Sequence, residues 1–153
     1  MHRYPLSFGV VLTVAGVLLT AGSAPKTDKR FLNPDGVPKP TGYTQVVSSG
    51  PGRMIFISGQ GGAGLDGQMP EDFAEQTKNT FENIGRCLQA AGARFEDIVK
   101  INYYVTDMAH TAELRKVRAN YLNQSAPPAS TLVQVGLGKG LKVEIEVVAL
   151  VPR

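Results

Sequence analysis

The sequence contains one cysteine, Cys87, and no tryptophan among its 153 residues. A single cysteine excludes a disulfide within the chain, and one cysteine with two histidines is too few for a structural zinc site. The net charge is also small, because 16 basic and 13 acidic residues leave only +3. So small an excess of basic residues argues against binding to nucleic acid. We therefore expect no metal, no cofactor and no nucleic-acid partner.

Long hydrophobic runs are absent except near the amino terminus, where residues 5–20 contain no charged side chain. Arg3 precedes this run and small polar residues follow it, which is the pattern of a secretory signal peptide. Its apolar core, residues 6–19, is shorter than the roughly 20 residues of a membrane-spanning helix. We expect cleavage after Ser23, rather than an uncleaved anchor, and export to the bacterial periplasm without stable membrane insertion. Loss of residues 1–23 removes one basic and no acidic residue, which leaves a net charge of +2.

The remaining chain is long enough for one domain, which we place at residues 41–153. Residues 24–40 contain four prolines and no periodicity, and they predict an extended lead-in. Two β-type runs, at about 43–48 and 53–58, flank the turn-forming residues 50–52 and predict a hairpin. Five glycines in residues 58–70 then predict a flexible loop.

Hydrophobic periodicity predicts helices at about 72–91 and 111–122 and strands at about 99–105, 131–136 and 141–150. Asp72 and Gly92 are typical of the start and end of the first helix. The order β-β-α-β-α-β-β predicts an α+β fold in which two helices cover one face of a mixed sheet. Val148 and Leu150 place apolar side chains on the other face, which predicts an oligomer.

Several segments of the chain, taken together, resemble the YjgF-type reactive-intermediate deaminases, or RidA family. The segments are "GYTQVV", "IFISGQ", the long stretch from "FAEQTKNTF" to "NYYVTDM", "PPAST" and "KVEIEVVAL". The resemblance extends from about Gly42 to Leu150. It implies a chorismate-mutase-like fold, a homotrimer, and a small-molecule ligand in a cleft at each subunit interface. It also implies hydrolysis of reactive imines and enamines to a 2-keto acid and ammonia.

The resemblance also assigns residues to the ligand site. Glu144 matches the glutamate that orients the attacking water and is the expected catalytic residue. The residues expected to bind ligand are Tyr43, Ser58, Gly59, Gln60, Arg115, Ser130 and Leu132. The chain departs from the family pattern at Thr41, where glycine is usual, and at Gly42, where proline is usual.

Ser130 is the most informative departure, because it stands where active relatives carry the arginine that holds the substrate carboxylate. A hydrogen bond to a charged group contributes roughly 1.5–3 kcal/mol, against about 1 kcal/mol for a neutral one. We therefore expect carboxylate binding to be weaker by about tenfold or more. Ser130 lacks the features of a nucleophile, because "PAST" is not a nucleophile elbow and His110 lies at a predicted helix start.

Two questions about the site stay open at this point. Arg115 falls where some relatives carry an asparagine in the cleft, and its guanidinium would replace the charge of the missing arginine. The simpler interpretation is that Arg115 lies on a solvated helix face with Lys116 and Arg118. Glu144 and Glu146 lie on the same side of a strand. They form either an acid–base pair, or one of them faces the ligand and the other is only its neighbour. The function is accordingly an imine or enamine deaminase of altered activity, or a non-catalytic exported trimer that binds a small metabolite.

Overall fold

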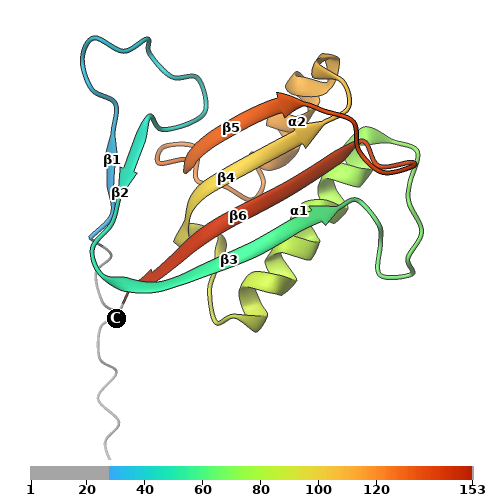
Figure 1. Cartoon of the computed structure of the whole chain (residues 1–153), viewed down its shortest axis with the longest axis horizontal. Helices are drawn as coiled ribbons and strands as arrows, with labels where there is room; N and C mark the ends of the chain where they lie inside the picture. The colour runs from blue at the N-terminus through green and yellow to red at the C-terminus, as the bar shows by residue number, and fades with distance from the viewer. Residues whose placement is uncertain (1–27, 153) are drawn as a thin grey trace, which may run out of the picture.

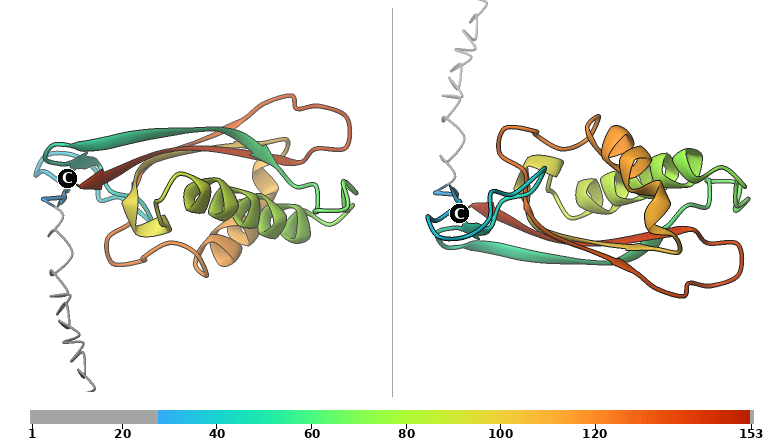
Figure 2. Two further views of the ribbon diagram at one scale, coloured as in Figure 1. Left: turned by 90° about the horizontal axis from the view of Figure 1, so that it is seen from below. Right: turned by 90° about the horizontal axis from the view of Figure 1, so that it is seen from above.

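The structure is a computed structural model, and it describes residues 28–152, so the predicted signal peptide at residues 1–23 lies outside the described residues. A four-stranded sheet has the order β3-β6-β4-β5, and both α-helices lie on one of its faces (Figures 1 and 2). The strands are β3 (Gly52–Gly61), β4 (Ile98–Val105), β5 (Ala129–Gln134) and β6 (Val143–Pro152); the helices are α1 (Phe73–Ala90) and α2 (Thr111–Arg118). The β4–β5 pair is parallel and the other pairs are antiparallel. The predicted α+β class, with two helices on one face of a mixed sheet, is confirmed.

The core fills the space between the helices and the sheet. Residues Ile101, Tyr103 and Val105 of β4 are buried against the helices, as their alternation predicts. On α1, Phe81 is fully buried, and its ring stacks on that of Tyr121 with the ring centroids 4.7 Å apart. The inward side of β6 is equally well covered, because Val143, Ile145, Val147 and Ala149 are all buried. Because these apolar side chains and the helices cover one face of the sheet, the opposite face stays open.

The boundaries of the helices follow local signals. The Asp72 carboxylate accepts a hydrogen bond from the Glu75 N–H, and Gly92 has a positive φ of 64° just beyond α1. Short 3-10 helices precede β4 (Phe95–Asp97) and α2 (Met108–His110). The helix α2 ends at Arg118, before the predicted end at residue 122, and turns continue to Tyr121. Ala112, which the periodicity assigns to the buried side, is exposed.

The predicted hairpin is wrong, because the two β-type runs pair with different strands. The strand β2 (Val46–Ser48) pairs with β1 (Arg30–Leu32), and β3 pairs along its length with β6. The turn at residues 50–52 redirects the chain instead of closing a hairpin, because ten-residue β6 offers β3 a far longer ladder than β2 does. The proline-rich lead-in thus supplies β1, and β1 and β2 form a separate two-stranded sheet beside the main one (Figure 1).

The other face of the main sheet has no covering layer within residues 28–152 (Figure 2). Met54 and Phe56 of β3 point to this open face and are 56% and 74% exposed. Val148 is half-buried, whereas Leu150, which the sequence places on an exposed face, is only 8% exposed. The apolar part of the open face is therefore contributed mainly by β3. Neither α1 nor α2 is long and apolar enough to cross a membrane.

Candidate functional site

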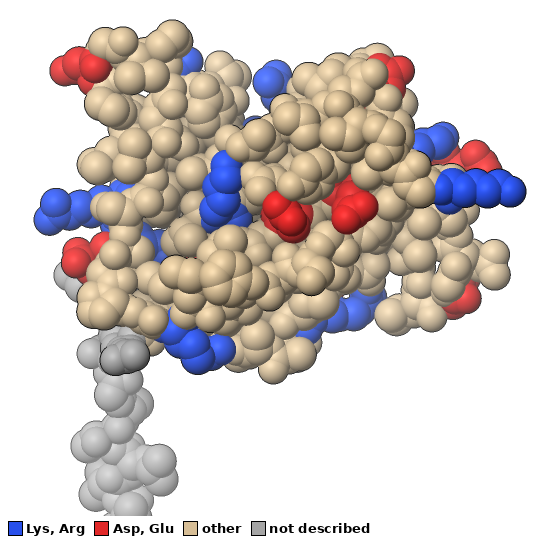
Figure 3. Space-filling model, viewed as in Figure 1, with Lys and Arg blue, Asp and Glu red and all other residues tan. Residues whose placement is uncertain are grey.

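Glu144 lies on the open face of the sheet and pairs with Gly61, just beyond an irregularity in β3. Ile57 pairs with Val147 and Gln60 pairs with Ile145, so Ser58 and Gly59 together face one residue of β6, Glu146. Such a bulge removes backbone groups from the ladder, and bulges are frequent beside active sites. We call Ser58, Gly59, Gln60 and Glu144 the Glu144 group. Acidic side chains gather near the middle of this face (Figure 3).

The glycine in the bulge makes room for the carboxylate. A Cβ atom added to Gly59 would lie 1.9 Å from Glu144 Oε1, well inside van der Waals contact. The Gln60 side chain donates from Nε2 to the Ser58 carbonyl at 3.0 Å, which holds the bulge in shape. The "SGQ" motif thus places backbone groups and one carboxylate at the same point of the surface.

Glu146, two residues along β6, has a different environment. Its Oε1 accepts hydrogen bonds from Asn102 Nδ2 at 2.7 Å and from the Tyr104 hydroxyl at 2.8 Å. These two bonds lower the pKa of the Glu146 carboxyl, and the same contact raises the pKa of the Tyr104 hydroxyl. Two neighbouring side chains thus hold the Glu146 carboxylate, which favours a structural role for Glu146 beside Glu144.

Tyr104→Phe is expected to raise the pKa of the Glu146 carboxyl, because it removes one donor to the ionised form. A carboxyl whose pKa is lowered on folding stabilises the fold above its unfolded pKa, and this contribution is lost as pH falls through the folded value. The variant should therefore lose this contribution at a higher pH than the wild type. Carbon-detected NMR titration measures the shift. Tyr121→Phe, on the helix side of the sheet, is the control, and an unchanged Glu146 pKa in Tyr104→Phe would contradict the assignment.

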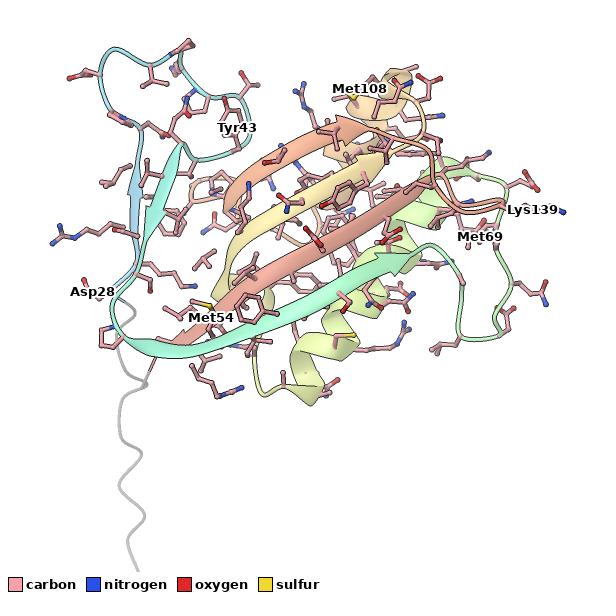
Figure 4. The ribbon with its side chains drawn as sticks, viewed as in Figure 1. Asp28, Tyr43, Met54, Met69, Met108 and Lys139 are labelled. Atoms are coloured by element: carbon pink, nitrogen blue, oxygen red, sulfur yellow. The ribbon has the colours of Figure 1, made fainter. Side chains whose placement is uncertain are left out.

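A second group of candidate residues lines a cavity of about 150 Å³ at the β5 edge of the sheet. The cavity lies between β5, α2 and the segment that leads into β2, and Figure 4 shows Tyr43 in that segment near the start of β5. We call it the Tyr43 cavity. Its lining residues are Thr41, Tyr43, Tyr103, Leu114, Arg115, Arg118, Ser130 and Leu132. All four predicted ligand-binding residues outside the Glu144 group are therefore brought together here.

Tyr43 is held between two anchored neighbours. The Gly42 carbonyl accepts a hydrogen bond from Arg118 Nη2 at 2.7 Å, and Gly42 has a φ of 74°, which proline cannot adopt. On the other side, the buried Thr44 hydroxyl donates to the Pro127 carbonyl at 2.6 Å. The backbone conformation that glycine allows at residue 42 thus presents its carbonyl to Arg118.

Arg118 lines the Tyr43 cavity, and sequence reasoning did not predict this. Its place beside Lys116 predicts a solvated face, but Arg118 is only 9% exposed whereas Arg115 and Lys116 are exposed. The carbon at the centre of its guanidinium lies 5.9 Å from the centroid of the Tyr103 ring. Arg118 lies four residues after the buried Leu114 and four before the buried Leu122, so helical spacing places it on the buried stripe and is the signal that would have found it.

Ser130 is half-buried in the Tyr43 cavity, on the side of β5 that faces the helices. His110 does not accompany it, because the imidazole stacks on Phe73 at 4.2 Å between ring centroids and its Nδ1 lies 3.1 Å from Glu113 Oε2. A serine nucleophile needs an adjacent base. The structure therefore gives no support to Ser130 as a nucleophile.

Within one chain, the Glu144 group and the Tyr43 cavity are separate. Glu144 pairs with Tyr104 of β4, and Tyr104 pairs with Val133 of β5. Two strand spacings, about 10 Å, therefore separate β6 from β5, and the two groups open on opposite faces of the sheet. One small ligand cannot contact both groups of the same chain.

Buried Gln76 on α1 fixes the loop that leads into the Glu144 strand. Its Nε2 donates to the carbonyls of Pro70 and Gly140, and its Oε1 accepts from the Lys142 N–H at 2.8 Å. The glycine-rich loop after β3 is held from the same helix, because Asn79 and Asn83 donate to its carbonyls. The loop that the sequence predicts to be flexible is thus anchored to α1. Separately, residues 28–152 contain no cluster of three potential metal ligands.

Comparison with known proteins identifies the sequence pattern. A family model described as Endoribonuclease L-PSP matches residues 35–151. A mouse protein named 2-iminobutanoate/2-iminopropanoate deaminase is 34% identical over 112 residues, which cover 71% of this chain and 80% of the mouse protein.

Solved structures agree with this match. The chain resembles RidA from an Antarctic Psychrobacter species with a TM-score of 0.62 and 35% identity, covering 79% of this chain and 98% of that one. It resembles a Rid-family protein of unknown function from Yersinia pestis with a TM-score of 0.69 and 28% identity, covering 80% and 98% of the two chains. The fold is therefore the chorismate-mutase-like fold of these proteins.

Proposed function

The chain belongs to the Endoribonuclease L-PSP family, which includes the YjgF and Rid proteins, and we propose that it hydrolyses small reactive imines or enamines. The observation that carries this proposal is the Glu144 group, where a carboxylate fits against Gly59 in a bulge whose backbone groups are free of the ladder. The mouse relative named as a 2-iminobutanoate/2-iminopropanoate deaminase supports the reaction class.

In the proposed reaction, the Glu144 carboxylate accepts a hydrogen bond from a water molecule and directs its oxygen at the imine carbon. As the C–O bond forms, Glu144 takes one proton from the water and passes it to the imine nitrogen, which gives a carbinolamine. Glu144 then takes the hydroxyl proton of the carbinolamine and passes it to the amine, the C–N bond breaks, and a keto group and ammonia leave. Orienting the water and accepting its proton are the roles that the position of Glu144 allows.

We infer that the complete site forms between two copies of the chain. The Glu144 group of one copy would face the Tyr43 cavity of the next, since one copy places them on opposite faces of the sheet. Exposed Met54 and Phe56 lie on the same open face as Glu144 and offer an apolar surface for this contact. A homotrimer with three equivalent clefts, as the family resemblance implies, satisfies this arrangement.

Ser130→Arg tests how the cleft uses its charge. Ser130 replaces the arginine of the family pattern, so we expect the wild type to release ammonia and 2-keto acid from freshly generated 2-iminopropanoate slowly. Restoring the guanidinium should raise the rate by about tenfold or more, because a charged fork binds a carboxylate more strongly than a hydroxyl does. Thr131→Arg, next along β5 on the opposite side of the strand, is the matched control. Absence of turnover in both the wild type and Ser130→Arg would contradict the deaminase proposal.

Binding without turnover is the second candidate function, and Ser130 is the observation that favours it. The signal-peptide pattern of residues 1–23 predicts export and the family resemblance implies a trimer, and such a trimer would then hold a small metabolite in each cleft. Calorimetric titration of the mature protein with 2-oxobutanoate, combined with the ammonia assay, separates the two functions. Binding without ammonia release by the wild type would favour this candidate.

A further inference from the structure

The Tyr43 cavity contains a buried cation without a protein counterion. Arg118 is 9% exposed, and the ion pairs that residues 28–152 form involve Lys78, Arg86 and His110, but not Arg118. A buried charge is costly unless it is paired, and arginine in particular favours bidentate contact with carboxylates. The guanidinium has five N–H donors, and the Gly42 carbonyl accepts from one of its nitrogens.

A second polar group beside Arg118 is also without a partner. The Tyr103 hydroxyl is buried and lines the cavity, and its one nearby donor within the described chain is the Arg118 guanidinium, whose approach falls short of hydrogen-bond geometry. Burial raises the pKa of Tyr103 to about 12, and the Arg118 cation opposes part of this rise. Buried polar groups are almost always hydrogen-bonded, so an orphan hydroxyl next to an uncompensated cation marks an incomplete site.

The residues that depart from the family pattern gather around the same guanidinium. Thr41 and Ser130 line the cavity with Arg118, and Gly42 supplies the carbonyl that holds it. A Cβ atom on residue 42 would lie 2.1 Å from Arg118 Nη2, so the glycine admits the guanidinium. Where the family pattern has an arginine, this chain has the uncharged Ser130. The cavity nevertheless contains a guanidinium, that of Arg118 on α2, and Gly42 leaves the space that it occupies.

We propose that Arg118 is the anion-binding residue of this cleft and that it holds the carboxylate of a small carboxylic acid. The volume of about 150 Å³ is below that of drug-sized pockets and fits an acid of roughly two to four carbons. Leu114 and Leu132 provide apolar contacts for its carbon chain, and exposed Arg115 lies at the cavity wall. Because Arg118 reaches the ligand from the helix side, binding is retained while the position of the reacting carbon relative to Glu144 changes.

This inference rests on the proposed function for its ligand class, but a binding measurement tests it without turnover. The probe is 2-oxobutanoate, titrated into the mature protein by calorimetry, with the neutral 2-oxobutanamide and inorganic phosphate as comparisons. We expect Arg118→Met to weaken 2-oxobutanoate binding by about tenfold or more, because it removes the charge and keeps much of the apolar stem. Lys116→Met, an exposed cation of α2, should leave it unchanged. The wild type should prefer 2-oxobutanoate to both comparison compounds.

Unchanged 2-oxobutanoate affinity in a folded Arg118→Met protein would overturn the proposal, as would tight binding of phosphate alone. If Arg118→Met does not fold, a crystal structure of the wild type with 2-oxobutanoate decides, since the carboxylate must lie within hydrogen-bond distance of Arg118. A carboxylate bound elsewhere, or no binding, contradicts the proposal. Arg118-dependent binding without ammonia release would refute the deaminase function alone, and turnover with Arg118-independent binding would refute this inference alone.

Discussion

Glu144→Ala is expected to reduce ammonia release from 2-iminopropanoate by about 100-fold or more, the usual effect of removing a positioned acid–base group. The carboxylate is the only acidic group of the Glu144 group, and neighbouring Glu146 is engaged by Asn102 and Tyr104. No other described carboxylate therefore stands ready to replace it. Rates in the wild-type and Ser130→Arg backgrounds, measured under single-turnover conditions, give the size of the effect.

Gly59→Ala provides an independent check on the same carboxylate. The added methyl group would displace the Glu144 side chain without removing it, so activity should fall in the same direction. Glu146→Gln is the control, and it should retain most of the activity because its partners are structural. A Glu144→Ala protein that keeps the wild-type rate would remove Glu144 from the reaction.

Gln76→Leu is expected to lower the free energy of unfolding by about 3 kcal/mol, because three hydrogen bonds are lost at about 1 kcal/mol each. Gln76 is fully buried, and it ties α1 to the carbonyls of Pro70 and Gly140 and to the N–H of Lys142. Leucine has a similar size but cannot make these bonds. Urea denaturation followed by circular dichroism measures the change.

Gln89→Leu is the matched control, because Gln89 is exposed on the same helix. It should change the free energy of unfolding by no more than about 0.5 kcal/mol. Since Lys142 lies two residues before Glu144, Gln76→Leu should also lower the hydrolysis rate more than Gln89→Leu does. Equal stabilities of the two variants would show that the Gln76 contacts contribute little.

Periodicity was sufficient to predict the central architecture. Ile101, Tyr103 and Val105 alternate along β4, and α1 has one apolar stripe. Both sets of apolar side chains are buried when the helices pack on one face of the sheet. The hairpin prediction failed because short strands carry no information about their partners. Only the fold shows that β3 pairs with the distant β6 and that β2 pairs with β1.

The family resemblance assigns Tyr43, Ser130 and Glu144 to one site, but the sequence does not show how the fold groups them. Ser130 pairs with Ile101 and Glu144 pairs with Tyr104, and these two residues of β4 point to opposite faces of the sheet. Arg118 escaped prediction because a basic residue in a basic helix is usually solvated. In the fold its guanidinium contacts Gly42, which is 76 residues away in sequence, and no local pattern encodes this contact.

Subunit mixing tests most directly the claim that each active site joins two copies of the chain. Wild-type chains and chains carrying both Ser130→Arg and Glu144→Ala are unfolded together in equal amounts and refolded. In sites shared between copies, about one quarter combine an intact Glu144 with the arginine introduced at position 130, so the mixture should reach about one quarter of the Ser130→Arg rate. If each chain builds its own site, the mixture will not exceed half of the slow wild-type rate, and the account of a shared cleft is wrong.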